Sequence, residues 1–368
     1  MSYVKYIGAE SMKLICSSCE QEPHPLDWRC GRCGSLLDFD RLPEFNPSEI
    51  NQKIFNLWRY QALLGIEARF SLGEGMTPLV KSEIEGHSFF AKLEYLNPTG
   101  SYKDRGTTVM MNHIASYGVK EVVEDSSGNA GASVAAFASI AGIQSHIYVP
   151  VTAAASKKGL IQALGGDLIE VAGPQYAKTE ACMKAAETIT YASHAWSPYF
   201  LLGQMTVAWE VWEQMDGECP DVVICPVGHG GLFLGFYRGF QVLKAAVLIE
   251  RLPRLVAVQA CACNPIVEAW ERGAEQPVEV QASATVADGI IVDHPTRGQE
   301  VLAAIRETGG TAISVEDDAI VAAQKALWSQ ALIAELTSAV TLAGLQTLDL
   351  GDQKVVLALT GNGLKTLS

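Results

Sequence analysis

The stretch "NPTGSYKDRG" (Asn97–Gly106) separates a strand-like segment from a helix-like one. The apolar run at 89–96 has the length of a strand, and 107–118 has a helical pattern that ends on glycine. Lys103 is therefore predicted at a strand-to-helix junction. Most lysines are solvated surface charges. At this junction, however, the helix dipole disfavours the ammonium form, and a neutral amine can form a Schiff base with a carbonyl group.

The same alternation of strand and helix continues beyond this stretch. Short β-branched runs predict strands at 120–125, 145–151, 167–173, 221–227, 254–260 and 354–360. Helical patterns lie between them at 132–142, 155–166, 176–189 and 232–246, and two more share 317–348. This order predicts an α/β protein with mostly parallel sheets, in which ligands bind beyond the carboxyl ends of the strands.

Composition limits the class of protein. The chain has 368 residues, of which 48% are apolar and 18% charged, and its formal net charge is -14. These values indicate a large core in about two domains, and they argue against a nucleic-acid or anionic-membrane partner. We find neither an apolar run long enough to span a membrane nor an apolar signal core, so we expect a cytoplasmic location.

Four of the nine cysteines form a pattern of their own. Two C-x2-C pairs, separated by ten residues, comprise Cys16, Cys19, Cys30 and Cys33. Each pair can place two thiolates on a turn, so four sulfur atoms can surround one tetrahedral ion. The pattern predicts a structural zinc site, with iron less favoured. Two disulfides, or a ribbon that has lost its metal, are the alternatives. The segment 40–50 that follows reads as a proline-punctuated linker.

Two loops that follow predicted strands could bind anions. The first, "SSGNAGAS" (Ser126–Ser133), opens a helix whose amides favour a carboxylate, although it could equally be an ordinary helix cap. The second, "PVGHGGLFLG" (Pro226–Gly235), clusters glycines that can wrap a phosphate group, although they could instead serve a tight turn. Phe233 occupies the third glycine position of a dinucleotide fingerprint, and no P-loop lysine follows.

The last strand ends on Thr360, whose hydroxyl could bond a ring nitrogen. An amine, a phosphate cradle and a carboxylate loop together fit pyridoxal 5'-phosphate acting on an amino acid.

Several motifs resemble those of the threonine synthase family, within the fold-type II pyridoxal-phosphate enzymes. These are "LGEGMTPLV" (Leu72–Val80), "KLEYLNPTGSYKDRG" (Lys92–Gly106), "SSGNAGAS", "PVGHGGLFLG" and "LTGNGLK" (Leu359–Lys365). They occur in the family's order over nearly the whole chain, and a four-cysteine ribbon precedes some members. The resemblance implies a two-domain, parallel-sheet fold like that of the tryptophan synthase β chain, with a small zinc-ribbon-like module in front.

The resemblance also implies roles for individual residues. Lys103 forms the Schiff base and moves protons at the substrate carbons, Asn129 bonds the ring hydroxyl of the cofactor, and Thr360 faces its ring nitrogen. The substrate carboxylate is expected to meet Ser126, Ser127, Gly128 and Ala130. The cofactor phosphate is expected to meet the amides of Gly228, His229, Gly230, Gly231 and Leu232.

The sequence departs from the family where the substrate phosphate binds. In "SHAWSPYFLLGQMT" (Ser193–Thr206), His194 and Ala195 replace an Asn-Ser pair, and Phe200 replaces an arginine. An aromatic ring cannot supply the charged bonds that a phosphate dianion needs. Either another cation compensates, with His194 the first candidate and Lys157 and Lys158 the others, or the substrate carries no phosphate.

The expected function is that of a threonine synthase, which converts O-phosphohomoserine to threonine by γ-elimination and β-addition of water. The alternatives are a related lyase or β-replacement enzyme acting on an unphosphorylated or smaller amino acid, and a non-catalytic cofactor-binding regulator. We expect a homodimer. The predicted domains are a module at 1–44, a cofactor-binding domain at 45–103 and 207–368, and a smaller mobile substrate domain at 104–206.

Overall fold

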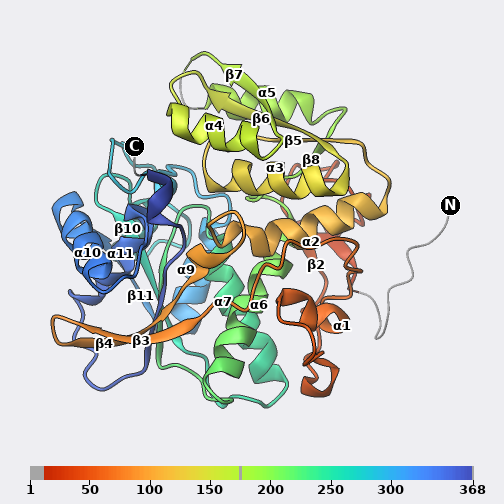
Figure 1. Cartoon of the computed structure of the whole chain (residues 1–368). Helices are drawn as coiled ribbons and strands as arrows, with labels where there is room; N and C mark the ends of the chain where they lie inside the picture. Colours follow the sequence, from red (N-terminus) through yellow and green to blue (C-terminus); the bar gives the residue numbers. More distant parts are fainter. Residues whose placement is uncertain (1–11, 174–175, 367–368) are drawn as a thin grey trace. The chain divides into compact units, whose positions relative to one another are not determined.

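The computed structural model describes residues 12–173 and 176–366 (Figure 1). The chain divides into two compact units. The first comprises Met1–Gly75 and Lys103–Gly203, and the second comprises Met76–Tyr102 and Gln204–Ser368. Within the described ranges, no helix combines the length and the apolarity needed to cross a membrane.

The first unit contains a four-stranded parallel sheet in the order β7-β6-β5-β8 (Figure 1). Its strands are β5 (Glu121–Glu124), β6 (Gln144–Pro150), β7 (Asp167–Val171) and β8 (Thr190–Tyr191). Its helices are α1 (Gln61–Leu64), α2 (Lys103–Ser116), α3 (Asn129–Ala141), α4 (Ala155–Ala163) and α5 (Ala177–Ala185). The alanine-rich α3 is buried along most of its length and packs against α2 and the sheet, because small side chains let helices approach closely.

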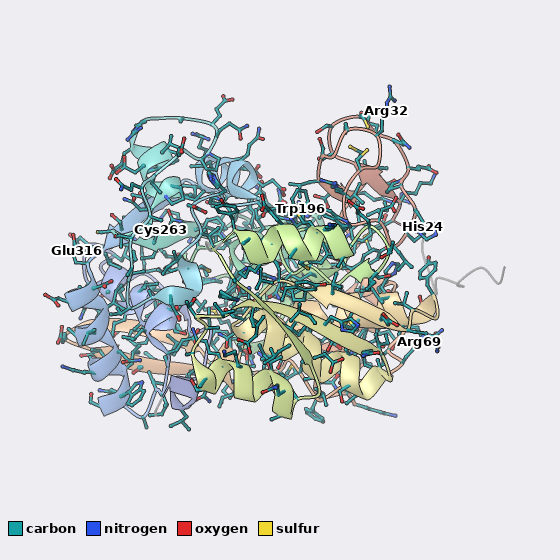
Figure 2. All side chains as sticks on the ribbon, turned by 90° about the horizontal axis from the view of Figure 1, so that it is seen from above. His24, Arg32, Arg69, Trp196, Cys263 and Glu316 are labelled. Atoms are coloured by element: carbon teal, nitrogen blue, oxygen red, sulfur yellow. The ribbon has the colours of Figure 1, made fainter. Side chains whose placement is uncertain are left out.

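The four-cysteine module belongs to this unit. A short antiparallel pair, β1 (Leu14–Cys16) and β2 (Leu37–Phe39), holds it together. The Trp28 ring packs edge-on against Tyr191 at 5.2 Å and against Trp196 at 5.0 Å, and Figure 2 labels Trp196. In the predicted linker that follows, most residues are exposed, although Phe45 and Ile50 are buried, and a 3-10 turn, η1 (Pro47–Glu49), interrupts it.

The second unit contains a six-stranded sheet in the order β11-β10-β9-β12-β4-β3. Its strands are β3 (Leu79–Ile84), β4 (His87–Lys92), β9 (Val222–Pro226), β10 (Arg254–Ala260), β11 (Thr311–Val315) and β12 (Val355–Ala358). All neighbours are parallel except β3, which pairs antiparallel with β4 through a tight turn. The predicted α/β class with mostly parallel sheets is confirmed.

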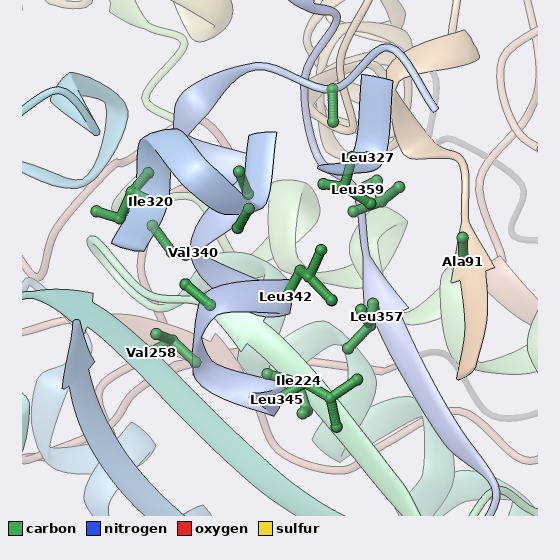
Figure 3. Packing of buried hydrophobic residues seen from close by; sticks show 14 of the residues in the cluster. Ala91, Ile224, Val258, Ile320, Leu327, Val340, Leu342, Leu345, Leu357 and Leu359 are labelled. Carbon is green, nitrogen blue, oxygen red and sulfur yellow. The ribbon is translucent and has the colours of Figure 1, made fainter. Parts of the chain in front are cut away.

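The helices of the second unit bury the apolar strands. They are α7 (Gly231–Ala245), α8 (Pro265–Glu271), α9 (Gly298–Glu307), α10 (Asp317–Ser329) and α11 (Leu336–Leu345), and α6 (Pro198–Gln214) begins in the first unit and ends in the second. Helix α11 is buried from Thr337 to Leu345 and has no polar face, as expected for a helix inside a core. Figure 3 shows Leu342 and Leu345 of α11 among Ile224, Val258 and Leu357 of three neighbouring strands.

Candidate active site

Each sheet has a point at which the strand order changes direction. In the first unit, β5, β6 and β7 follow one another outward, whereas β8 lies on the other side of β5. In the second unit, β9, β10 and β11 run outward in the same way, and β12 lies on the other side of β9. Loops diverge above such a point, so the carboxyl ends of two adjacent strands form the usual ligand position in an open α/β sheet. The predicted site loops follow these four strands, β5, β8, β9 and β12.

The loop after β5 holds the predicted carboxylate site. It runs from Ser126 to Gly128 and leads into α3, whose first residue is Asn129. The N-cap is Gly128, which offers no side chain to the helix amides, and Ser126 Oγ instead accepts a bond of 3.3 Å from the Gly128 N–H. This helix is therefore capped by a glycine and not by a side chain. A helix of 13 residues that starts on glycine suits an anionic group.

Lys103 lies at a helix start, as predicted, although α2 begins on Lys103 itself and not at the predicted residue 107, and the lysine is half-buried. Its Nζ atom lies 5.8 Å from the centroid of the Phe200 ring. The next residue, Asp104, is buried and accepts a bond of 2.7 Å from Ser133 Oγ of α3, which fixes the start of α2. A Cβ atom at Gly106 would lie 2.5 Å from Phe200 Cδ2, so only glycine lets α2 approach this ring.

The loop after β8 brings His194 to a residue that sequence reasoning missed. Its Nδ1 atom lies 2.6 Å from Oε1 of Glu124, the last residue of β5. The Glu124 side chain is fully buried and that of His194 is mostly buried. Burial raises the pKa of Glu124 well above its usual value, and the neighbouring Asp125 charge adds to this. Burial also lowers the pKa of His194 well below its usual value, and the positive charge of Lys103 lowers it further.

The Phe200 ring lies beside this pair. Its centroid is 6.1 Å from that of the His194 ring, with the two rings nearly perpendicular. Phe200 is buried, as is Ala195. The alternative cation Lys158 pairs with Glu170 of β7 at 2.8 Å. In this unit, His194 and Phe200 therefore place an imidazole and an aromatic ring at the two positions where the sequence resemblance predicts a departure from the family.

The glycine loop after β9 leads into the 15-residue helix α7. Gly230 is its N-cap, with φ at 97°, and a Cβ atom there would lie 2.6 Å from Val301 Cγ2. The His229 ring is held by Thr296, whose Oγ1 atom lies 3.0 Å from Nδ1. Gly228, Gly231 and Leu232 complete the loop. A backbone cradle that excludes side chains and ends on a helix N-terminus fits a phosphate group.

Thr360 follows β12, the neighbour of β9. Its side chain is buried, and its Oγ1 atom lies 2.9 Å from Ser338 Oγ of α11. Ser338 Oγ also accepts a bond of 2.9 Å from the Gly361 N–H. Sequence reasoning missed Ser338, because a hydroxyl inside an apolar helical pattern gives no sign of facing a strand end. The hydroxyl groups of Thr360 and Ser338 thus form a buried pair at the end of β12, next to the strand that leads into the glycine loop. Such a pair can form a hydrogen bond with a neutral ring nitrogen.

The four predicted metal ligands lie together. Sγ of Cys16 is 3.4 Å from that of Cys33, and Sγ of Cys19 is 3.6 Å from that of Cys30. All four sulfur atoms are within 4.8 Å of one another, and the four thiols are free, so the disulfide alternative is wrong. A tetrahedral zinc ion with bonds of 2.3 Å separates its sulfur ligands by about 3.8 Å. The cluster therefore has the size of a metal site.

The first unit supplies a lysine at a helix start, and the second supplies a glycine loop after a parallel strand. Both features are expected of a pyridoxal-phosphate enzyme, and comparisons with known proteins support this class. The model of the family described as "Pyridoxal-phosphate dependent enzyme" matches residues 70–361. Among solved structures, a maize serine racemase aligns with a TM-score of 0.66 at 25% identity, covering 78% of this chain and 88% of that one. A threonine deaminase from Solanum lycopersicum aligns with a TM-score of 0.68 at 21% identity, covering 98% and 95%.

Curated relatives narrow the class. A threonine synthase of Methanosarcina acetivorans is 33% identical over 96% of this chain and 92% of its own length. One of Methanocaldococcus jannaschii is 33% identical over 90% and 87%. The chain belongs to the fold-type II pyridoxal-phosphate dependent enzymes and, within them, to the threonine synthase family. Its cofactor is pyridoxal 5'-phosphate, and it is a lyase, so the alternative of a non-catalytic regulator is set aside.

Proposed function

We propose that this enzyme converts O-phosphohomoserine to threonine by γ-elimination of phosphate and β-addition of water. The observation that carries the proposal is the 33% identity to a threonine synthase over 96% of the chain. The half-buried Lys103 at the start of α2 supports it, because this chemistry needs an amine that can form a Schiff base with the cofactor.

The cofactor, when bound, supplies an aldehyde that condenses with amines and a ring that withdraws electrons from the substrate carbons. Lys103 holds it and then moves protons at those carbons. Asn129 bonds its ring hydroxyl, and Thr360, supported by Ser338, meets its ring nitrogen with a hydroxyl. Because a hydroxyl does not keep that nitrogen protonated, the site favours elimination and replacement at the β and γ carbons.

The two loops divide the remaining binding tasks. The backbone amides at the start of α7 hold the cofactor phosphate, and they come from Gly228, His229, Gly230, Gly231 and Leu232. The start of α3 holds the substrate carboxylate with Ser126, Ser127, Gly128 and Ala130. His194 contacts the substrate side chain. The segment 104–206 is proposed to move when substrate binds.

A second candidate function is the dehydration of threonine or serine, or a related replacement on an unphosphorylated amino acid. The observation that favours it is the buried Phe200 ring, 5.8 Å from Lys103 Nζ, where the family pattern has arginine. Loss of a charged hydrogen bond costs about 2–3 kcal/mol. His194 is a weak substitute, since its lowered pKa keeps it neutral.

Incubation of the purified enzyme with each substrate separates the two candidates. Release of threonine and phosphate in equal amounts from O-phosphohomoserine supports the first. Release of a 2-oxo acid and ammonia from threonine or serine, with no turnover of O-phosphohomoserine, supports the second and overturns the first.

The remaining proposals concern the surroundings of the enzyme. We propose that Cys16, Cys19, Cys30 and Cys33 bind one structural zinc ion, that the enzyme is a homodimer, and that it acts in the cytoplasm. The four sulfur atoms support the first, because all are thiols at ligand distance and leave no open position for catalysis. Elemental analysis should find one zinc per chain, and a Cys16→Ser, Cys30→Ser variant should have none.

A further inference from the structure

The Glu124 carboxyl group has an unusual environment. It is fully buried at the end of β5, and one oxygen, Oε1, bonds to His194. The other oxygen, Oε2, is also buried and has no hydrogen-bond partner in the described part of the chain. A buried polar atom left in this state costs about 1–3 kcal/mol, so its presence at a strand end beside the site calls for a functional reason.

Burial and the surrounding charges together determine where the proton shared by Glu124 and His194 lies. Lys103, Asp125 and Lys178 are the charged groups that act on both Glu124 and His194. The pKa of the carboxyl is raised and that of the imidazole is lowered, chiefly by burial in each case. Both shifts favour the same state, a neutral carboxylic acid beside a neutral imidazole. The acid then donates its hydrogen to Nδ1, and the ring proton lies on Nε2.

The pair lies beside the amine that carries the chemistry. The Lys103 Nζ atom and the His194 ring both face Phe200, at 5.8 Å and 6.1 Å from its centroid. The strands β5 and β8, which hold Glu124 and lead to His194, are adjacent at the switch point of their sheet. His194 thus shares a ring neighbour with the amine that would hold the substrate, and the charge of Lys103 acts on both members of the pair.

We propose that Glu124 and His194 form a proton relay for the oxygen atom that leaves the substrate side chain and for the water oxygen that adds to it later. His194 contacts each of these oxygens, and Glu124 is a positioning residue that holds the ring and stores the proton. The inference rests on the proposed function only in requiring a carbon–oxygen bond to break, which both candidate substrates provide.

The relay balances in both directions. During elimination the carbon–oxygen bond breaks and its electron pair leaves with the oxygen, which takes the proton from His194 Nε2. Nδ1 then takes the proton of Glu124, which becomes a carboxylate. In the threonine synthase reaction, the oxygen of water then bonds to carbon and gives a proton to Nε2, while Nδ1 returns its proton to Glu124. After a dehydration, Nε2 takes this proton from solvent water, and Nδ1 again returns its proton to Glu124. Phosphate trianion and hydroxide are both strongly basic leaving groups, so either needs this proton.

The chain contains a matched control on the same sheet. His146 Nε2 of β6 lies 3.5 Å from Glu121 Oε2 at the start of β5, where the Glu121 side chain is exposed and His146 is half-buried. It combines the same two residue types at the opposite end of the same strand. Glu121→Gln should therefore leave kcat, KM and the pH profile unchanged.

Glu124→Gln is the decisive variant, because an amide keeps the shape and the hydrogen bond to Nδ1 but has no acid proton to give. We expect kcat to fall about 10²- to 10³-fold with KM nearly unchanged. In the wild type, activity falls as pH rises through the elevated pKa of Glu124, and the variant should lose this limb. A variant with the kcat and pH profile of Glu121→Gln would overturn the relay.

A second measurement needs no substrate and so separates this inference from the proposed function. Nitrogen NMR of the holoenzyme, with His194 assigned from a His194→Asn variant, reports the tautomer of the ring. We expect a neutral ring protonated on Nε2 throughout the pH range in which an ordinary imidazole titrates. A His194 signal that titrates near its usual value overturns the relay, whichever substrate the enzyme uses. An enzyme inactive on both substrates but with this locked tautomer overturns the proposed function alone.

Discussion

Two fully buried glutamates, one in each unit, face basic partners in different ways. In the second unit, Glu210 Oε2 lies 2.9 Å from Lys92 Nζ, and Glu210 Oε1 accepts a bond of 2.7 Å from the Met76 N–H. Lys92 Nζ also reaches the Thr77 carbonyl at 2.6 Å and Gln214 Oε1 at 2.8 Å. In the first unit, Glu124 Oε1 bonds to His194, whereas Oε2 has no hydrogen-bond partner in the described ranges.

This difference in hydrogen bonding indicates that the Lys92–Glu210 network is structural and that the Glu124–His194 pair is reactive. When every donor and acceptor is used, as around Lys92, the network holds two permanent charges and has nothing to exchange. At Glu124, by contrast, one oxygen lacks a partner within the described ranges and the raised pKa favours the protonated acid, so the group holds a proton that it can give up. Completeness of hydrogen bonding, more than burial alone, therefore distinguishes the two glutamates.

The largest predicted effect is the loss of turnover in a Lys103 variant. A Lys92 variant is the matched comparison, because Lys92 belongs to the structural network. Lys103→Ala should lower turnover by at least about 10⁴-fold, the upper range for a proton-transfer residue, and should abolish the visible absorption of the lysine-bound cofactor. Lys92→Met should leave that absorption intact. Absorption spectra and initial rates of both variants check this. A Lys103→Ala enzyme with the wild-type spectrum would contradict the assignment of the lysine.

The next effect concerns stability. Glu210→Ala leaves the Lys92 ammonium buried without its counter-ion, and breaking such a pair costs about 3–5 kcal/mol. We expect this loss in urea unfolding monitored by fluorescence, with turnover per folded molecule unchanged. The double variant Lys92→Met, Glu210→Leu should recover most of it, since no charge remains. If Glu210→Ala and the wild type have the same free energy of unfolding, the Lys92–Glu210 network does not stabilise the fold and its structural role is wrong.

A smaller effect is expected at Phe200, where a charge would convert the neutral pair into an ionic one. In Phe200→Arg, the guanidinium can bind a substrate phosphate and should lower KM for O-phosphohomoserine about 10- to 100-fold. The same charge lowers the pKa of Glu124 and should reduce kcat. Phe200→Leu is the control for lost aromatic volume. Steady-state kinetics with an unchanged KM in Phe200→Arg would show that position 200 does not meet the phosphate.

Much of the architecture could be predicted, because alternation of apolar runs is a local signal. Strands β5, β6, β7, β9, β10 and β12 lie where their β-branched runs predict them, and α2 begins on Lys103 itself. The antiparallel β3 was missed because its polar alternation gives no sign of which neighbour it joins. Strand β8 was missed because it has two residues, and helix α6 because its start reads as a loop.

The candidate site could be predicted only in part, for a physical reason. Loops such as Ser126–Gly128 and the glycine loop carry their chemistry in consecutive residues. The role of Glu124 could not be predicted in this way. In the run Val-Val-Glu-Asp, the sequence does not show which of the two neighbouring carboxyl groups burial affects more strongly. Asp125 accepts bonds from Thr179 and Tyr191 and keeps a lowered pKa near 2, whereas Glu124 beside it has a raised pKa. The roles of the site residues and the domain bounds stay predictions.

A last test extends the comparison to a second buried imidazole, His113 of α2. Its Nε2 atom lies 3.0 Å from the Pro25 carbonyl of the four-cysteine module, and its ring stacks on Tyr199 with centroids 3.5 Å apart. Burial lowers the pKa of His113 to about 4, from 6.5. Like His194 it is neutral, but its partner is a carbonyl that can neither store nor return a proton, so its role should be structural.

The depressed pKa of His113 sets a pH dependence of stability. The unfolded chain takes up a proton below about pH 6.5 and the folded chain only near pH 4, so the contribution is complete above 6.5 and is lost as pH falls toward 4. Between pH 7 and pH 5 this loss is about 2 kcal/mol. His113→Gln keeps a neutral donor for the Pro25 carbonyl and removes the titration. The difference in unfolding free energy between wild type and variant should therefore shift by that amount in favour of the variant at pH 5. If the difference in unfolding free energy between the wild type and His113→Gln does not change with pH, water reaches the His113 ring. His113 would then not be a buried structural imidazole with which His194 can be compared.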